Sequence, residues 1–205
     1  MAYRRTARTE ARKADIRRRL LEVGRRLVSE GGFTAIQIGT VAALAGVATG
    51  TVYRYFPSKA DLSAAVFHRV SQHEIDVAAA IAASGGTATE RLTAAVRAVA
   101  GRAQQGRITA YALIAEPADA AIDTQRLIHK RALALVFADI LGDGVSAGEF
   151  PKQDIAVSAA CIVGALMESL SKPLSPESEG VGGDDLVNAV AGFCLNGAQS
   201  PEPAA

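Results

Sequence analysis

The chain has 205 residues, of which 49% are hydrophobic and 21% charged. This composition excludes wholesale disorder and allows one large domain or a small domain joined to a larger one. Charge is unevenly distributed: residues 1–60 hold 12 Lys and Arg against 4 Asp and Glu, whereas residues 61–205 hold 10 against 17. A basic first third suggests a polyanionic partner, although a merely solvated basic helix explains the charge alone equally well.

The first predicted elements form a small group of helices. Residues 1–12 are interpreted as a basic flexible arm and residues 13–58 as a separate N-terminal domain. Its first helix has apolar residues at three- and four-residue spacing, namely Ile16, Leu20, Val23 and Leu27. The pair Gly31-Gly32 ends this helix, because glycine readily adopts a positive φ. Two short helical patterns follow, of which the second runs from Thr49 to Phe56.

The rest of the chain has the pattern of longer helices. Ser58 can cap a connecting helix over 59–83, because its hydroxyl can accept a hydrogen bond from a free N–H group of the first turn. Residues 84–197 are predicted to form a larger second domain, and residues 198–205 a disordered tail. No run shows strand alternation, so we predict an all-α fold. The helices expected in residues 84–197 lie at about 87–105, 107–115, 118–141, 153–172 and 184–197.

The stretch from 37 to 56 has the pattern of a helix-turn-helix. Its turn has to be small because the two helices cross at close range, and Ala45 and Gly46 meet that need. Val52 and Phe56, four residues apart, place an apolar face inward. The groups left outside can contact DNA phosphates and base edges. The predicted DNA-binding residues are Arg4, Arg5, Gln37, Thr49, Gly50, Thr51, Tyr53, Arg54, Tyr55 and Lys59.

The run from Val41 to Leu62 resembles the signature of the tetracycline-repressor (TetR) family, and the resemblance covers residues 13–65. A helical corner with surface tyrosines would explain a lone Tyr-x-Tyr, but not the whole run. The resemblance implies a homodimeric transcriptional repressor that binds a palindromic operator in double-stranded DNA and leaves it when a small-molecule effector binds. Two departures, Gln37 and Ala48, replace Ser or Thr helix caps, each worth about 0.5–2 kcal/mol.

The resemblance also implies that the last two large helices join two copies in a four-helix bundle. An ordinary intramolecular core is the alternative, and the sequence does not separate the two. The predicted dimer-interface residues are Ile155, Ala159, Ile162, Val163, Leu166, Leu170, Leu186, Val190 and Phe193.

The resemblance further implies a cavity for an apolar or amphipathic effector among the helices that follow the N-terminal domain. The effector would stabilise a dimer whose DNA-binding domains are too far apart or tilted, and the helix over 59–83 would connect the two sites. Plain core is the alternative for most apolar members. The predicted lining is Phe67, Val70, Tyr111, Ile114, Glu116, Ile122, Arg126, His129, Leu133, Phe137 and Met167.

Other functions have no pattern in the sequence. There is no Gly-rich phosphate loop after a strand and no nucleophile elbow, so we expect no enzyme and no cofactor. Cys161 and Cys194 are interpreted as buried thiols, and no Cys/His group suggests a metal site. Without a secretory signal or about 18 consecutive apolar residues, a cytoplasmic protein with no membrane span is expected. A membrane-surface protein and a non-specific DNA-coating protein remain alternatives, which liposome flotation and competition with random duplex would test.

Overall fold

The computed structural model describes residues 7–178 and 183–200, and every regular element in those ranges is a helix. We call residues 7–58 the head; it contains α1 (Ala7–Gly31), the 3₁₀ helix η1 (Phe33–Ala35), α2 (Ile38–Leu44) and α3 (Thr49–Tyr55). The described residues from 59 onward are the body; it contains α4 (Lys59–Ala82), α5 (Ala88–Gln105), α6 (Arg107–Ile114), α7 (Ala120–Ser146), α8 (Ile155–Leu174) and α9 (Gly183–Gln199). The all-α prediction is confirmed.

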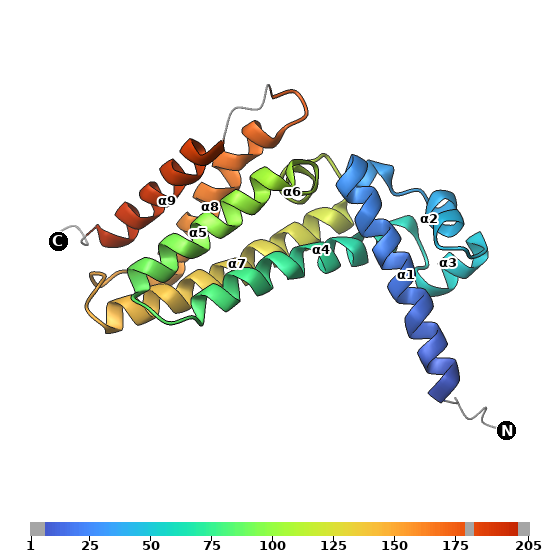
Figure 1. The fold of residues 1–205 in the computed structure, drawn as a ribbon, viewed down its shortest axis with the longest axis horizontal. Helices are drawn as coiled ribbons and strands as arrows, with labels where there is room; N and C mark the ends of the chain where they lie inside the picture. Colours follow the sequence, from blue (N-terminus) through green and yellow to red (C-terminus); the bar gives the residue numbers. More distant parts are fainter. Residues whose placement is uncertain (1–6, 179–182, 201–205) are drawn as a thin grey trace.

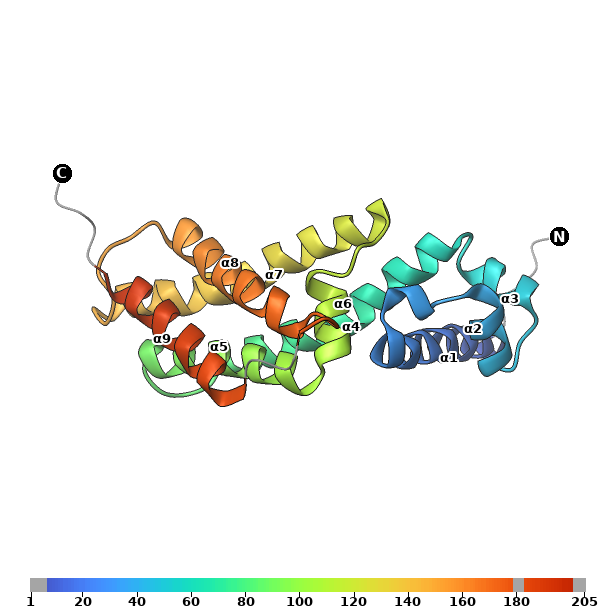
Figure 2. The ribbon, with the colours of Figure 1, turned by 90° about the horizontal axis from the view of Figure 1, so that it is seen from above.

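The head and the body form the two ends of an elongated molecule (Figure 1). Helices α4, α5 and α7 run along the body, with α8 and α9 beside them. Seen from above, α6 lies where the body meets the head (Figure 2). Helix α4 contacts α1 as well as α5 and α7, so one continuous helix links the head to the body.

The buried apolar residues form two cores, one in the head and one in the body, but the head core also includes residues of the body. The head core is built around Leu20, Val52 and Leu62, all fully buried. It also contains Leu113 from α6 and Ile122 from α7, so side chains of the body complete the interior of the head. The body core includes the fully buried side chains Leu92, Leu133, Phe137, Leu166 and Leu170.

Two helices are longer than the sequence patterns predict. Helix α1 begins at Ala7, so residues 7–12 are helical and the expected arm over 1–12 is wrong for them. Helix α7 runs on to Ser146 because Gly144 permits a close contact rather than a break. A Cβ atom at Gly144 would lie 2.2 Å from the Phe150 ring, closer than real side chains allow.

The C-terminal helix also extends beyond its predicted end. Helix α9 reaches Gln199, so the expected disordered tail over 198–205 is wrong at its first two positions. Ala198 is buried, and its carbonyl accepts a hydrogen bond of 2.9 Å from Gln153 Nε2. This contact holds the last turn of α9 against the loop before α8. Residues 201–205 lie outside the described part of the chain.

Among the described residues, α8 alone is long and apolar enough to cross a membrane by length and composition. One such helix is weak evidence for a membrane span, because a core helix in a soluble protein has the same features. Here Ile162, Leu166 and Leu170 of α8 are buried in the body core. Packing within the body therefore accounts for the apolar character of that face.

Candidate nucleic-acid interface and ligand cavity

The turn between α2 and α3 is held tightly on the head. Gly46 has φ +64°, a left-handed conformation that favours glycine. Ala45 is buried, and its carbonyl accepts a hydrogen bond of 3.1 Å from Arg19 Nη1 in α1. Val47, which follows Gly46, packs against the head core. This arrangement fixes the angle at which α3 leaves the turn.

Helix α3 holds six of the residues predicted to contact DNA and exposes four of them. Its inward face is apolar, because Val52 is fully buried and Phe56 follows it at 3% exposure. Tyr53 is 49% exposed, although large aromatic residues usually lie inside. An exposed phenol beside an exposed guanidinium is what a phosphate or base edge requires. The α3 residues exposed to solvent are Thr49, Gly50, Tyr53 and Arg54, whereas Thr51 and Tyr55 are half-buried.

The other predicted DNA-binding residues have different surroundings. Lys59 is exposed at the start of α4. Gln37 precedes α2 without capping it, because its Nε2 donates backward to the Thr34 carbonyl at 3.2 Å. Ala48 likewise leaves α3 without a side-chain cap. Arg4 and Arg5 lie outside the described residues, so their proposed contacts remain predictions.

Helix α1 supports α3 through contacts that the sequence patterns did not reveal. The Arg17 guanidinium lies over the Phe56 ring, 5.4 Å from its centroid. Gly24 permits the closest approach of α1 to α4: a Cβ atom there would lie 2.4 Å from Val66 Cγ2. Arg17 and Gly24 lie outside the apolar stripe of α1, so helical periodicity gave no signal for either.

A buried carboxylate, Glu116, connects the head to the body. It lies between α6 and α7 at 7% exposure, and its oxygens accept hydrogen bonds from the Phe33 and Thr34 backbone N–H groups at 2.8 and 3.2 Å. Gly32 has φ +69°, and a Cβ atom there would lie 2.7 Å from the carboxylate. Glu116 therefore caps η1 across 83 residues of sequence. It does not line the cavity described below, so its predicted place in the lining is wrong.

Arg126 stabilises the same junction from α7. Its guanidinium donates to the backbone carbonyls of Ala112 and Leu113 at 2.9 and 3.1 Å, and also to the Glu116 carbonyl. These carbonyls end α6, where acceptors lack partners within the helix. Arg126 was predicted to line the effector cavity, but its donors are used to hold α6 against α7.

Aromatic contacts connect this junction to the interior of the body. The Phe33 and Phe67 rings stack with centroids 5.7 Å apart, and Phe67 meets the His129 ring edge-on at 6.3 Å. Phe67 is fully buried in the head core, as is Ile122 at 1% exposure. These two residues belong to that core and not to the cavity. The rings of Phe33, Phe67 and His129 thus form a row of direct contacts from η1 to α7.

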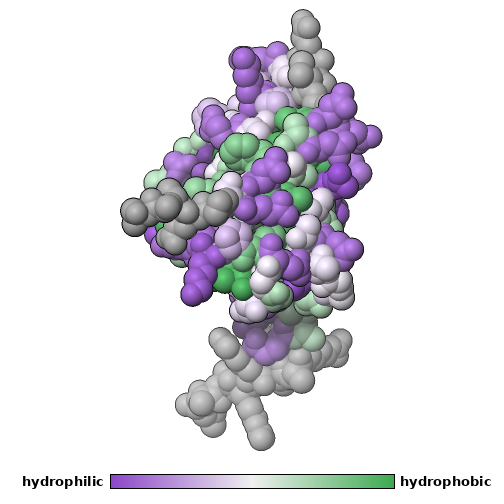
Figure 3. Space-filling view, turned by 90° about the vertical axis from the view of Figure 1, so that its left-hand side faces the viewer, coloured by the Kyte–Doolittle hydropathy of each residue, from purple (hydrophilic) through white to green (hydrophobic). Residues whose placement is uncertain are grey.

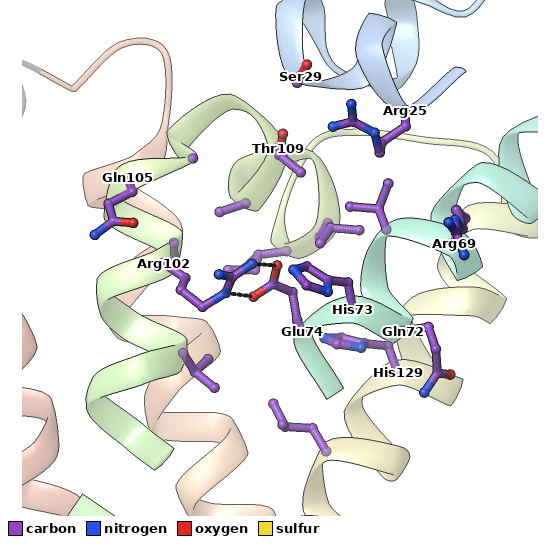
Figure 4. A pocket seen from close by; sticks show the side chains of 18 of the residues that line it. Arg25, Ser29, Arg69, Gln72, His73, Glu74, Arg102, Gln105, Thr109 and His129 are labelled. Carbon is purple, nitrogen blue, oxygen red and sulfur yellow. Dashed lines mark hydrogen bonds and ion pairs between the residues drawn. The ribbon is translucent and has the colours of Figure 1, made fainter. Parts of the chain in front are cut away.

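A cavity of about 640 Å³ lies between α1, α4, α5, α6, α7 and α8 (Figure 4). Its lining includes five of the predicted residues: Val70, Ile114, His129, Leu133 and Met167. Tyr111 and Phe137 do not line it, since they pack in the body core instead. The lining residues that the sequence reading missed include Glu22, Arg25, Arg69, His73, Glu74, Val99, Arg102, Thr109, Leu113 and Leu170.

The polar groups of the cavity are mostly paired with one another. Arg102 Nε and Nη2 donate to both oxygens of Glu74 at 2.7 and 2.8 Å, from α5 to α4 (Figure 4). This bidentate bond raises the pKa of Arg102. Arg25 donates to Glu22 at 2.6 Å, which lowers the pKa of that carboxyl. Arg69, on the exposed rim, makes no hydrogen bond or ion pair within the described ranges.

The predicted dimer-interface residues divide into buried and exposed groups. Six of them are buried within one copy of the chain, where a second copy cannot reach them: Ala159, Ile162, Val163, Leu166, Leu170 and Val190. The predicted contact role of these six is therefore wrong, and the intramolecular alternative accounts for them. Ile155 and Leu186 are half-buried, whereas Phe193 is 69% exposed.

The outer surfaces of α8 and α9 carry small and apolar residues. Val157 is 57% exposed on α8. Cys161, one turn further along α8, is exposed and not buried as predicted, while burial raises the pKa of Cys194 to about 11. A Cβ atom added at Gly164 or Gly192 would meet nothing within 4 Å. Figure 3, which faces the end of the body away from the head, shows apolar surface between polar side chains. The outer face consists of Ala156, Val157, Ala160, Cys161, Gly164, Ala189, Gly192 and Phe193.

No group of three or more His, Cys, Asp or Glu side chains with the spacing of a metal site occurs in the described ranges 7–178 and 183–200.

Comparison with known proteins agrees with the geometry of the head. The family model of bacterial regulatory proteins, tetR family, matches residues 20–66. The HTH-type transcriptional repressor KstR of Mycolicibacterium smegmatis is 40% identical over 76 residues, which are 37% of this chain and 37% of that protein. The chain thus matches little more than a third of the length of this relative. The part matched by the family model includes the whole turn and α3.

Comparison with solved structures extends the likeness in fold to the body. A putative TetR-family regulator from Syntrophomonas wolfei superposes with a TM-score of 0.75 at 20% identity, covering 92% of this chain and 97% of that one. FadR from Bacillus subtilis, solved in complex with stearoyl-CoA, superposes with a TM-score of 0.69 at 20% identity, covering 89% and 97%. The likeness to the tetR family model thus covers residues 20–66, in the head and the start of α4, and the solved structures show that the described chain has the same fold as these regulators.

Proposed function

We propose that this protein is a cytoplasmic transcriptional repressor that binds a palindromic operator in double-stranded DNA as a homodimer and leaves it when an amphipathic small molecule enters the cavity. The observation that carries the proposal is the outward face of α3, with Thr49, Tyr53 and Arg54 exposed on a helix whose other face is buried. A helix of this kind fits the major groove, where base edges present distinct donor and acceptor patterns.

Two copies are needed for specific binding, because seven residues of α3 reach few base pairs. The outer face of α8 and α9 suits such pairing, since small residues allow helices of two copies to approach closely. Phe193 supplies the large apolar side chain of that face. In the dimer we propose, the two α3 helices lie about 34–36 Å apart and enter successive major grooves.

The dimer is tested by replacing Phe193 with Asp and measuring mass in solution by light scattering. We expect the mass to fall from two copies to one, because the charge would be desolvated in the interface. Leu135→Asp is the control: Leu135 is 68% exposed and belongs to α7, not to α8 or α9. A monomeric wild type, or equal effects of the two substitutions, would contradict this interface.

The effector is proposed from the two kinds of surface in the cavity. Val70, Leu133 and Met167 are apolar, whereas Arg69 is an exposed cation of the same lining, whose charge also helps to lower the pKa of Glu22. A molecule with an apolar chain and an acidic end matches both the apolar and the cationic parts of this lining. The likeness in fold to FadR, a regulator solved with stearoyl-CoA, supports an amphipathic ligand of this general kind.

The DNA-binding function is tested by selecting bound duplexes from a random pool with the full chain. We expect enrichment of an inverted repeat whose half-sites are separated by about one helical turn. The first effector probe is dodecanoate, which has an apolar chain and one acidic end. Added to the complex, it should release the selected duplex. A pool that remains unenriched would overturn the proposal.

A further inference from the structure

A second hollow adjoins the cavity, in a groove between α1 and α4. The groove has a volume of about 500 Å³ and shares three lining residues with the cavity, namely Glu22, Arg69 and Gln72. Arg69 and Gln72 project from α4 on the side of the cavity away from α5 (Figure 4). The groove and the cavity therefore meet between α1 and α4.

The lining residues advance along both helices in the same order. On α1 they lie within 14–22 in the groove and within 22–29 in the cavity. On α4 they lie within 65–72 in the groove and within 69–76 in the cavity. A ligand whose chain fills the cavity can thus extend its other end between α1 and α4 to the outside of the head.

The two hollows differ in charge. In the cavity, Arg102 and Glu74 neutralise each other through their bidentate hydrogen bonds. The groove instead has an excess of cations, because among its described lining residues three arginines accompany one carboxylate, that of Glu22. These arginines are Arg17, Arg18 and Arg69. The groove therefore favours an anion with more than one negative charge.

Two of these guanidinium groups are available to a ligand. Arg69 is exposed and makes no hydrogen bond or ion pair within the described ranges. Arg18 is exposed and pairs with Asp15 of the same helix, but exposed pairs are weak, so little is lost when another anion replaces this carboxylate. The pKa of Glu22 is lowered by its hydrogen bond with Arg25 and also by the charges of Arg69 and Arg18, which therefore converge where the groove meets the cavity.

From this arrangement we infer that the acidic end of the effector is a phosphate group, and that Arg18 of the head and Arg69 of the body bind this phosphate in the groove. The inference rests on the proposed function of the cavity as the effector site. A phosphate ester carries a charge of about −1.5 to −2 at pH 7 and three acceptor oxygens, which suits two guanidinium groups better than a carboxylate does. The bound phosphate joins α1 to α4, so the effector contacts the head directly.

The test uses the full-length protein and three ligands of equal chain length: dodecyl phosphate, dodecanoate and dodecanol, each below its micelle concentration. Calorimetry measures their affinities. We expect dodecyl phosphate to bind about ten-fold tighter than dodecanoate, because Arg69 can bind either anion whereas Arg18 adds a second contact to the phosphate. Dodecanol should bind most weakly, and the ³¹P resonance of dodecyl phosphate should shift on binding.

Two further ligands identify the source of the phosphate. Dodecanoyl-CoA carries its phosphates on a nucleotide, whereas dodecanoylglycerol phosphate carries one as a lipid headgroup. The ligand that binds tighter shows whether the effector is a nucleotide thioester or a phosphorylated lipid. If both bind more weakly than dodecanoate, the inference is overturned.

Substitutions separate the two arginines. Arg18→Gln should reduce the preference for phosphate over carboxylate to less than about three-fold, and Arg69→Gln should weaken both anions but not dodecanol. Both side chains are exposed, so the fold should tolerate these changes. Arg26→Gln is the matched control, because Arg26 is exposed on α1 and lines neither hollow. Arg17 is left intact, since its guanidinium lies over the Phe56 ring.

The outcomes distinguish this inference from the function on which it rests. If dodecyl phosphate binds no tighter than dodecanoate, or if Arg18→Gln keeps the full preference, the inference is overturned while the amphipathic effector stands. If Arg18→Gln weakens only the binding of the selected duplex, Arg18 contacts DNA and the inference is likewise overturned. If none of the ligands binds, both the inference and the amphipathic effector are overturned.

Discussion

The head and the body use α-helices in different ways. In the head, the long helix α1 packs closely on α4 across Gly24, and the turn between the short helices α2 and α3 depends on Gly46. In the body, longer helices stand far enough apart to leave a cavity of about 640 Å³. The head presents a fixed outer surface, whereas the body encloses a space. The comparison teaches that the proposed DNA-binding surface rests on tight packing, whereas the proposed effector site rests on packing that is incomplete.

Helix capping shows the same contrast. Helices α2 and α3 of the head begin at Gln37 and Ala48 without side-chain caps. Helices α4 and α5 begin at Ser58 and Thr87, whose hydroxyls accept from the Asp61 and Glu90 N–H groups. A helix that begins without a cap leaves backbone N–H groups of its first turn without partners. The short helices α2 and α3 are therefore stabilised by packing against the rest of the head.

The largest effect is expected on DNA binding from Arg54→Ala. Loss of a guanidinium that contacts a base or phosphate costs about 1–3 kcal/mol, so affinity for the selected duplex should fall by about 5- to 150-fold. Fluorescence anisotropy at fixed salt measures this. Arg131→Ala is the control, because it removes the same charge from an exposed site on α7. Equal losses for both variants would remove Arg54 from the interface.

Gly24→Ala tests the close packing of the head. The added methyl would overlap Val66, and overpacking of this kind costs about 1–3 kcal/mol of unfolding free energy. Gly39→Ala is the matched control on α2: its Cβ atom would meet nothing within 4 Å, so helix propensity should stabilise it by up to about 1 kcal/mol. Chemical denaturation compares the two. A stable Gly24→Ala variant would contradict the close packing of α1 on α4.

Glu116→Ala tests the junction between the two regions. The Phe33 and Thr34 N–H groups would lose a charged acceptor, which lowers the unfolding free energy by about 1–3 kcal/mol. Hydrogen exchange should accelerate at these two amides before it does so in the body. Glu168→Ala, on an exposed site of α8, should leave both amides protected. Unchanged exchange in Glu116→Ala would show that the carboxylate does not hold the head.

Helix caps should have smaller effects of opposite sign in the two regions. Thr87→Ala removes the capping box of α5 and should cost about 0.5–2 kcal/mol. Ala48→Ser adds a cap that α3 lacks and should stabilise the head by up to about 1 kcal/mol. Thermal unfolding measures both. A destabilised Ala48→Ser variant would show that the start of α3 has no room for a cap.

The smallest effect is a dependence of stability on pH. Because the folded pKa of His129 lies below its ordinary value of 6.5, the unfolded chain binds the proton more readily. The unfolding free energy should be constant just above pH 6.5 and fall as the pH decreases from there toward the folded pKa. Glu22 and Glu149, whose pKa values are lowered from 4.5, lose their contributions only at more acidic pH. His129→Phe should abolish the decrease that begins near 6.5, and a decrease retained in that variant would refute its origin.

The sequence predicted the head well because local features determine it. The small turn, the inward pair Val52 and Phe56, and the cap at Ser58 are all set by neighbours within a few positions. The contacts of Arg17 and Gly24 were missed because they depend on how α1 crosses α3 and α4. Crossing geometry is not encoded in helical periodicity.

The sequence predicted the body less completely for the same reason. Periodicity correctly placed Ile162 and Leu166 on a buried face, but it could not show whether the same chain or a second copy covers that face. Glu116 was assigned to the cavity only through the family resemblance. Its true partners are backbone groups more than 80 positions away, which no local pattern reveals.

The central claim is that the exposed face of α3 recognises a specific DNA sequence. The most direct measurement is the ratio of affinities for the selected inverted repeat and for a random duplex of equal length, at one salt concentration. The account predicts that the repeat binds tighter by about 10³ or more. Equal affinity for both duplexes would contradict it.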